Sequence, residues 1–397
     1  MAGRRDDARC LYSLSYSSTE FRWCSFCPLS ACHLVPTTVT FWIQKPAIQK
    51  PAFLSTMTHT ILHVMLVHAM LVLATGIPTD RHLLFATMPS SGSPAVPQDF
   101  AFDCSAVERL PAQTNPTPTW DINLVELTVV DLGNGAYALV DGEGDTRQKN
   151  EDGIAAPTSG GFIVTPAGIV VVETYLNYHT ACQARNLIVQ TAPPNVPIKF
   201  VVCTSAHLDH CSGNSVFVAE GVKFVQHQET FHLLSDADYL AGDKTFMMNA
   251  LGYNAGIQET TPITADMVML LAADSDLELT LGHDTVVAKY FGRAQTHGDL
   301  FVWHESSQTL FTGNPIIAAV GPSLPWFLDG NVQGGKQALV NFKAFVQAQA
   351  TPPQIVPGHG VISTAGASIA TSYINYINEL QDLTAEAIMA NMSLTQA

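Results

Sequence analysis

The sequence has few basic residues and few long apolar runs. Lys and Arg number 18 among 397 residues, against 34 Asp and Glu, and the formal net charge is −16. Proteins that bind duplex nucleic acid need Lys and Arg to displace counterions from phosphate, so no nucleic-acid partner is expected. No apolar run has a length that spans a bilayer comfortably. The 47% hydrophobic content excludes an intrinsically disordered chain.

Cysteines and nucleotide-binding motifs are scarce as well. Of the eight cysteines, four lie within the first 32 residues, which leaves too few elsewhere for a disulfide-rich secreted module. The sequence has no P-loop, no Gly-x-Gly-x-x-Gly and no Gly-x-Ser-x-Gly, the motifs of nucleotide binding and serine hydrolysis. What remains is a globular protein that acts on a small molecule.

Four segments follow one another along the chain. Residues 1–56 are net positive and show no helical or strand periodicity, as in an unstructured leader or a misjoined upstream sequence. Residues 57–76 hold an apolar run followed by small residues, which favours a signal peptide or membrane anchor over a buried amphipathic helix. Residues 77–118 are a Pro-rich linker, and 119–397 are the folded domain. Export would permit one disulfide, Cys104–Cys182 among the possible pairings.

Strands and helices alternate in both halves of that domain, which predicts an α/β layered fold. The helices are expected at 178–190, 228–249, 335–349 and 366–390. The strands are expected at 122–130, 136–140, 161–165, 169–174, 198–203, 277–281, 284–290, 299–304, 308–313 and 354–356.

The chemistry of the sequence is concentrated directly after the strand 198–203. His207, Asp209 and His210 lie within four residues on a loop that ends at Gly213. Imidazole and carboxylate are the ligand types that suit zinc and similar first-row metals. The pattern therefore indicates a metal site on this loop.

Further along the chain, three segments complete a recognisable series. They are Gly292-Arg-Ala-Gln-Thr-His-Gly-Asp299, Leu310-Phe-Thr-Gly-Asn314 and Pro357-Gly-His359-Gly360. Together with the His207 loop, in this order, they resemble the metallo-β-lactamase superfamily over about residues 122–390. The resemblance implies a four-layer αββα sandwich with metals at one edge, and a hydrolase of small esters, lactones, thioesters or amides.

The departures from the family pattern concern its metal ligands. Ser205 and Gln295 stand where the family has two histidines of the first metal position, and Asn314 replaces the carboxylate that bridges both metals. His207 remains of the first position, and Asp209, His210 and His359 remain of the second. Three protein ligands with an open water position meet the usual requirement of catalytic zinc, so one zinc ion is expected rather than two.

The resemblance therefore leaves two functions open. In the first, a hydroxide on a single zinc ion attacks the substrate carbonyl, Asp209 orients or deprotonates the water, and His207 is a fourth ligand or an outer donor. In the second, the chain is a catalytically inactive relative with a binding or structural role. His297 is expected to be a surface or core residue rather than a ligand, and Cys211 a small buried residue rather than a thiolate ligand or nucleophile.

Overall fold

The computed structural model describes two units separately, Met1–Thr56 and Met57–Ala397. The described residues are 11–17, 20–26, 102–107, 125–141, 158–218, 220–250, 263–272, 275–318, 329–393 and 396. In the first unit, β1 (Leu11–Ser17) and β2 (Glu20–Phe26) pair antiparallel, where the sequence shows no strand periodicity. The leader assignment otherwise falls on residues outside the described ones, as do the signal or anchor segment and most of the linker. Among the described residues, no helix is long and apolar enough to cross a membrane.

The first half of the large unit forms a seven-stranded sheet. Its first strands are β3 (Leu127–Gly133), β4 (Ala136–Asp141), β5 (Gly160–Thr165) and β6 (Gly168–Val172), each antiparallel to the next. The strands β7 (Ile198–Val202), β8 (Lys223–His227) and β9 (Val268–Leu271) then continue parallel to β6. Parallel neighbours need crossover connections. Here the connections hold α3 (Tyr178–Thr191), α4 (Leu208–Cys211), α5 (Asn214–Val218), α6 (Gln228–Leu234) and α7 (Ala237–Ala250).

The second half forms a five-stranded sheet in the order β10-β11-β12-β13-β15. Its strands are β10 (Leu277–Leu281), β11 (Asp284–Lys289), β12 (Phe301–His304), β13 (Thr309–Phe311) and β15 (Gln354–Val356). The first four are antiparallel, and β15 is parallel to β13 across α8 (Val332–Ala348). The short strands β14 (Ile317–Ala318) and β16 (His359–Gly360) pair in parallel, and α9 (Gly366–Met389) closes the fold.

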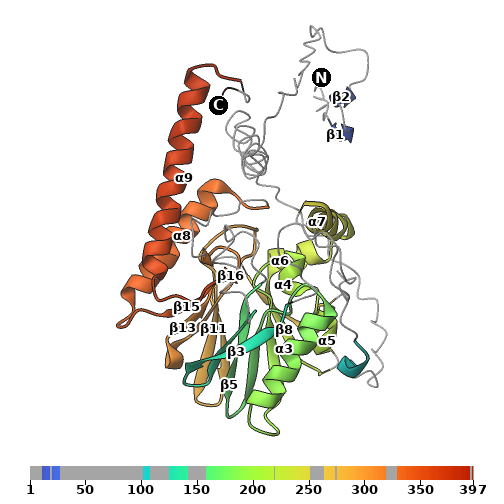
Figure 1. Cartoon of the computed structure of the whole chain (residues 1–397), viewed down its shortest axis with the longest axis vertical. Coiled ribbons are helices and arrows are strands. Elements are labelled where there is room, and N and C mark those ends of the chain that lie inside the picture. The colour runs from blue at the N-terminus through green and yellow to red at the C-terminus, as the bar shows by residue number, and fades with distance from the viewer. Residues whose placement is uncertain are drawn as a thin grey trace, which may run out of the picture. The chain divides into compact units, whose positions relative to one another are not determined.

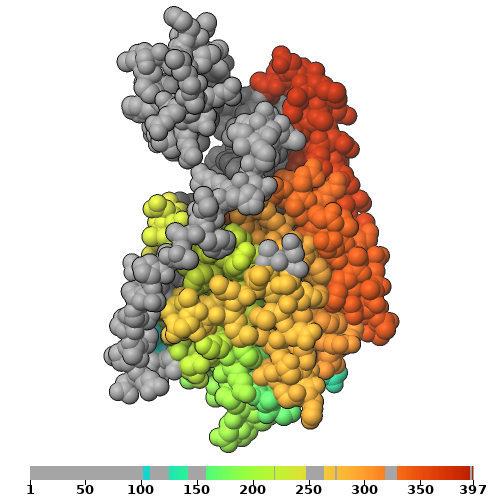
Figure 2. All heavy atoms as spheres, turned by 180° about the vertical axis from the view of Figure 1, so that it is seen from behind, coloured from blue at the N-terminus to red at the C-terminus, as the bar shows by residue number. Residues whose placement is uncertain are grey.

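Three hydrophobic clusters separate four layers, because alternate strand residues face opposite sides of a sheet. Ile169 and Val171 of β6 pack in the cluster that α3 and α5 cover, whereas Val170 and Val172 pack between the two sheets. In β12, Val302 faces that inner cluster and its neighbours face the cluster under α8 and α9. The helices accordingly lie on the two outer faces (Figure 1), and α9 runs along one side of the molecule in the opposite view (Figure 2). This arrangement confirms the predicted four-layer αββα sandwich.

The register of the sheets places the functional loops at one edge. Glu173 follows β6, the His207 loop follows β7, Asn314 follows β13 and His359 follows β15. Because β6 and β7 are parallel, as are β13 and β15, the carboxyl ends of each pair meet on the same side. Crevices outside the carboxyl ends of parallel strands are where open α/β sheets bind ligands.

Candidate metal centre

The structure brings three of the four predicted ligands together. Asp209, His210 and His359 each offer one donor atom, these atoms lie within 4.8 Å of one another, and all three side chains are buried. Asp209 Oδ2 lies 3.5 Å from His210 Nε2 and 3.2 Å from His359 Nε2. His207 is not in this group.

The amide of Asn314 lies among the imidazoles. Its Oδ1 accepts hydrogen bonds from Nε2 of His210 at 2.8 Å and from Nε2 of His359 at 3.0 Å. Its Nδ2 donates to His207 Nδ1 at 3.0 Å and to Ser205 Oγ at 3.4 Å. This amide orientation satisfies all four neighbours, with the acceptor toward the second metal position and the donor toward the first.

Donor spacing tests whether a metal fits. Four donors around a tetrahedral zinc with bonds of about 2.0–2.1 Å lie about 3.3 Å apart. The separations from Asp209 Oδ2 to the two imidazoles bracket that value. Asp209 Oδ1 is buried and has no hydrogen-bond partner among the described residues, which leaves a carboxylate oxygen available. The residues present therefore fit one zinc ion at the second position.

The first position of the family pattern keeps one of its three imidazoles, His207. Ser205 and Gln295 are buried, but neither offers a charged or imidazole ligand. The side-chain amide atoms of Gln295 have no hydrogen-bond partner among the described residues. Asn314 presents its N–H groups on this side, and N–H donors repel a cation. His207 is held by Asp329 instead, whose Oδ2 lies 3.1 Å from His207 Nε2 and also accepts from the Tyr239 hydroxyl.

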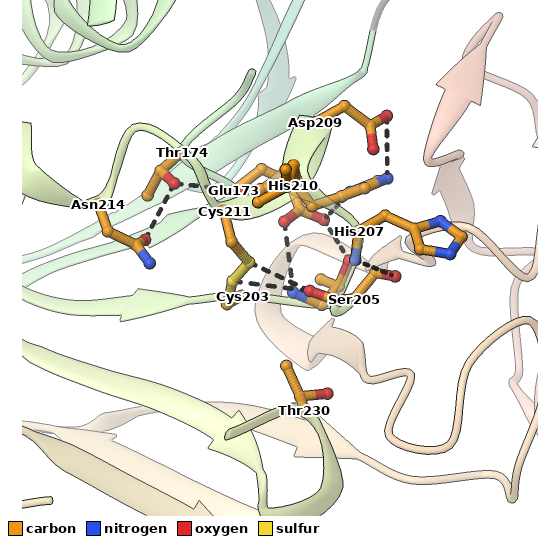
Figure 3. The surroundings of a disulfide bond; sticks show 12 residues. Glu173, Thr174, Cys203, Ser205, His207, Asp209, His210, Cys211, Asn214 and Thr230 are labelled. Carbon is orange, nitrogen blue, oxygen red and sulfur yellow. Dashed lines mark hydrogen bonds and ion pairs between the residues drawn. A yellow bond between two sulfur atoms is a disulfide. The ribbon is translucent and has the colours of Figure 1, made fainter. Parts of the chain in front are cut away.

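A buried carboxylate that the sequence analysis assigned no role supports His210. Glu173 Oε1 lies 3.1 Å from His210 Nδ1, and the Thr204 hydroxyl donates a hydrogen bond to the same oxygen. Glu173 has a φ of 74°, a left-handed conformation that is rare for a residue other than glycine. Strained backbone of this kind persists where surrounding contacts over-determine it. Figure 3 shows Glu173 beside His210 and the cysteine pair next to them.

Charge in the metal-free centre is balanced by protons on histidine. Burial opposes a charge on His210, but the carboxylates of Asp209 and Glu173 raise its pKa to about 9. Burial alone would raise the pKa of Asp209, but the imidazoles of His210 and His359 outweigh it and hold that pKa well below its usual range. The Thr158 hydroxyl also donates to Asp209 Oδ2 at 2.8 Å. A divalent cation would replace these protons.

Two glycines let the loops of the second sheet approach each other. Gly358 N donates to Gly313 O at 2.9 Å, and a Cβ on Gly358 would collide with the Gly313 backbone. Gly313 has a φ of 57° and packs against Thr204. This close contact presents the neighbouring side chains of Asn314 and His359 to the centre.

His297 and Cys211, the two residues weighed as further metal ligands, have other contacts. His297 is half-buried against the Arg293 guanidinium, and burial followed by that positive charge lowers its pKa. Cys211 is fully buried, as expected, but it is not alone: it forms a disulfide with Cys203. The predicted pair Cys104–Cys182 is also a disulfide, with its Cα atoms 5.5 Å apart.

Comparisons with known proteins find structural likeness only. Among solved structures, the chain is similar to the metallo-β-lactamase from Pontibacter korlensis, with 18% identity and a TM-score of 0.46 over 64% of this chain and 99% of that one. The DIM-1 metallo-β-lactamase exposed to ceftazidime matches with 16% identity and a TM-score of 0.47, over 64% and 97% of the two chains. TMB-1 matches with 15% identity and a TM-score of 0.45, over 64% and 98%. No family model and no curated protein matches the sequence.

Proposed function

We propose that the chain is a hydrolase of the metallo-β-lactamase type that works with a single zinc ion held by Asp209, His210 and His359. The observation that carries this proposal is the buried Asp-His-His group with zinc-like donor spacing. A buried carboxylate beside two imidazoles, with a pKa held well below its usual range, is typical of a functional site.

The residues of the chain have separate tasks in this mechanism. When bound, zinc polarises a substrate carbonyl and lowers the pKa of its water toward about 7. Asp209 is held by Thr158 through Oδ2, and its Oδ1, which has no hydrogen-bond partner among the described residues, would orient the attacking water. Glu173 fixes His210 through Nδ1, so that Nε2 faces the centre. The substrate class is a small ester, lactone, thioester or amide.

Asn314 explains why one ion is proposed. An aspartate at this place would offer an anionic oxygen to each of two ions, whereas the amide offers one carbonyl oxygen and one donor. The second metal position keeps a neutral oxygen 2.8 Å and 3.0 Å from the two imidazoles. The first position keeps only His207, which Asp329 engages.

Metal content of the purified full-length chain tests the proposal. The wild type should contain about one zinc per chain after zinc is supplied, and His210→Ala and His359→Ala should contain nearly none. His304→Gln is the matched control, because His304 is also a buried imidazole on a carboxylate, Asp284, away from the centre. A zinc-loaded wild type is then assayed on the four substrate types. A wild type that takes up no zinc would favour the alternative, an inactive relative with a binding role.

We also propose that the protein is exported. Disulfides persist in oxidising compartments, and Cys104–Cys182 joins the segment before the domain to α3. The proposal is tested by expressing the chain in cells and counting the free thiols of the secreted protein under denaturing conditions. Cys104 and Cys182 should contribute none.

A further inference from the structure

The cysteine pair encloses the metal loop. Cys203 directly follows β7 and Cys211 is the last residue of α4, eight positions later. The Cα atoms are 5.9 Å apart, within the usual range for a disulfide. The ring that the disulfide closes contains His207, Asp209 and His210. The link thus brackets two of the three donors of the proposed zinc site.

A second tie crosses the same loop. Glu173 accepts from Thr204, the residue after Cys203, and faces His210, the residue before Cys211. The backbone N–H of Thr174 also donates to His210 O at 2.8 Å. The disulfide and the Glu173 carboxylate therefore fasten the same two ends of the loop. Figure 3 shows Glu173, His210 and the two cysteines close together.

We propose that the Cys203–Cys211 disulfide and the zinc site are coupled, so that zinc protects the disulfide from reduction and the disulfide strengthens zinc binding. This inference rests on the zinc site proposed above. Both cysteines are fully buried, so a reductant reaches the sulfur atoms only when the loop opens. A metal that binds Asp209 and His210 suppresses that opening, and by linkage the closed loop favours the metal to the same degree.

The redox step is a simple exchange. A dithiol reductant breaks the S–S bond, Cys203 and Cys211 each become a thiol, and the reductant leaves as a disulfide after giving up two electrons and two protons. With a phosphine as reductant, the phosphine leaves as its oxide, with the oxygen and the two protons supplied by water. Without the disulfide, the side chains of Glu173 and Asn314 still join the two ends of the loop.

The test follows reduction of the wild-type full-length chain by a phosphine, with and without bound zinc. Free thiols are alkylated at intervals and counted for each cysteine by peptide mass spectrometry. Cys203 and Cys211 should be labelled at least tenfold more slowly in the zinc-loaded chain. Cys104–Cys182 is the internal control, and its rate should be the same in both. Equal rates at Cys203 and Cys211, or labelling of both without reductant, would overturn the inference.

Zinc affinity gives the reciprocal readout. The double variant Cys203→Ser/Cys211→Ser should bind zinc at least tenfold more weakly than the wild type, whereas Cys104→Ser/Cys182→Ser should bind it equally well. Unchanged affinity in the first double variant contradicts the coupling. If the wild type takes up no zinc, the zinc site and this inference fall together. If it binds zinc but the reduction rates are equal, the coupling alone is wrong.

Discussion

Glu173 Oε1 lies 3.1 Å from Nδ1 of His210, and both side chains are buried. The carboxylate thereby fixes the imidazole with Nε2 toward Asp209 and Asn314. Carboxylates that hold the outer nitrogen of a ligating histidine orient the ring and raise its basicity. Glu173 lies directly after β6, and its backbone has the left-handed conformation that is rare for a residue other than glycine.

Replacing this carboxylate should weaken the metal site without abolishing it. Glu173→Gln should lower zinc affinity by about 10- to 100-fold, because an amide holds the imidazole less firmly. Competition with a chromogenic chelator measures the change. Glu305→Gln, at an exposed position in a different loop, is the control and should leave the affinity unchanged. An equal affinity in Glu173→Gln would show that the carboxylate has no part in ligand positioning.

Asn314 allows a gain-of-function experiment. Asn314→Asp adds an anionic oxygen next to His210 and His359, so zinc affinity should rise about tenfold or more while the stoichiometry stays near one. The triple variant Ser205→His/Gln295→His/Asn314→Asp should take up about two zinc ions. Metal analysis after gel filtration measures both. A wild type that already holds two ions would contradict the role given to the amide.

Zinc affinity should depend on pH through His210. The ion displaces the proton that the neighbouring carboxylates hold on this imidazole, whose pKa is about 9. Each displaced proton makes the affinity rise about tenfold per pH unit below that pKa, and the rise levels off above it. Calorimetry in buffers of different ionisation enthalpy counts the released protons. No proton release at pH 7 would mean that His210 is neutral in the metal-free protein.

The metal-free protein should respond to pH in the opposite sense. The folded-state pKa of His210 lies above its ordinary value of 6.5, so the charged imidazole stabilises the fold. This contribution is fully present below about pH 6.5 and is lost as the pH rises toward 9. The Tm in chelator should therefore fall over that interval by roughly 4 °C or more. His210→Gln should show a smaller fall, and an equal one would assign the effect to other groups.

The second helical layer offers a stability test away from the centre. Phe342 of α8 is fully buried and its ring stacks on Phe301 of β12 at 5.6 Å. Phe342→Ala should lower the free energy of unfolding by about 3–5 kcal/mol. Val340, on the exposed face of the same helix, is the control, and Val340→Ala should change it by less than about 0.5 kcal/mol. Urea unfolding of both variants gives the comparison.

The sequence predicted the strands of alternating or continuous apolar residues and the amphipathic helices α3, α8 and α9. The spacing of apolar residues within each of these segments is enough to predict its secondary structure. The predicted helix 228–249 is two helices, α6 and α7, broken where the Asp236 side chain accepts from the N–H groups of residues 238 and 239. The strands β8 and β9 were not predicted. Each is only four or five residues long, and their parallel pairing with β7 comes from the fold rather than from the sequence nearby.

The residues of the candidate metal centre were also predicted only in part. Asp209, His210 and His359 were predicted from motif order, and the structure brings them together. The roles of Glu173, Thr158 and Cys203 depend on contacts between loops that are distant in the sequence, so spacing along the chain does not reveal them. The role of Asn314 was predictable from the sequence only in part. Its substitution is visible in the sequence, but the direction in which its amide faces is visible only in the fold.

The centre draws its residues from both sheets. Asp209 and His210 follow a strand of the seven-stranded sheet, and Asn314 and His359 follow strands of the five-stranded one. Neither half of the chain holds a complete set, so an ion bound there spans the seam between two halves that each have their own strands and outer helices. Metal binding therefore requires that the two halves are packed together as in the native fold. A loss of metal that precedes the loss of helical signal on heating would report their separation.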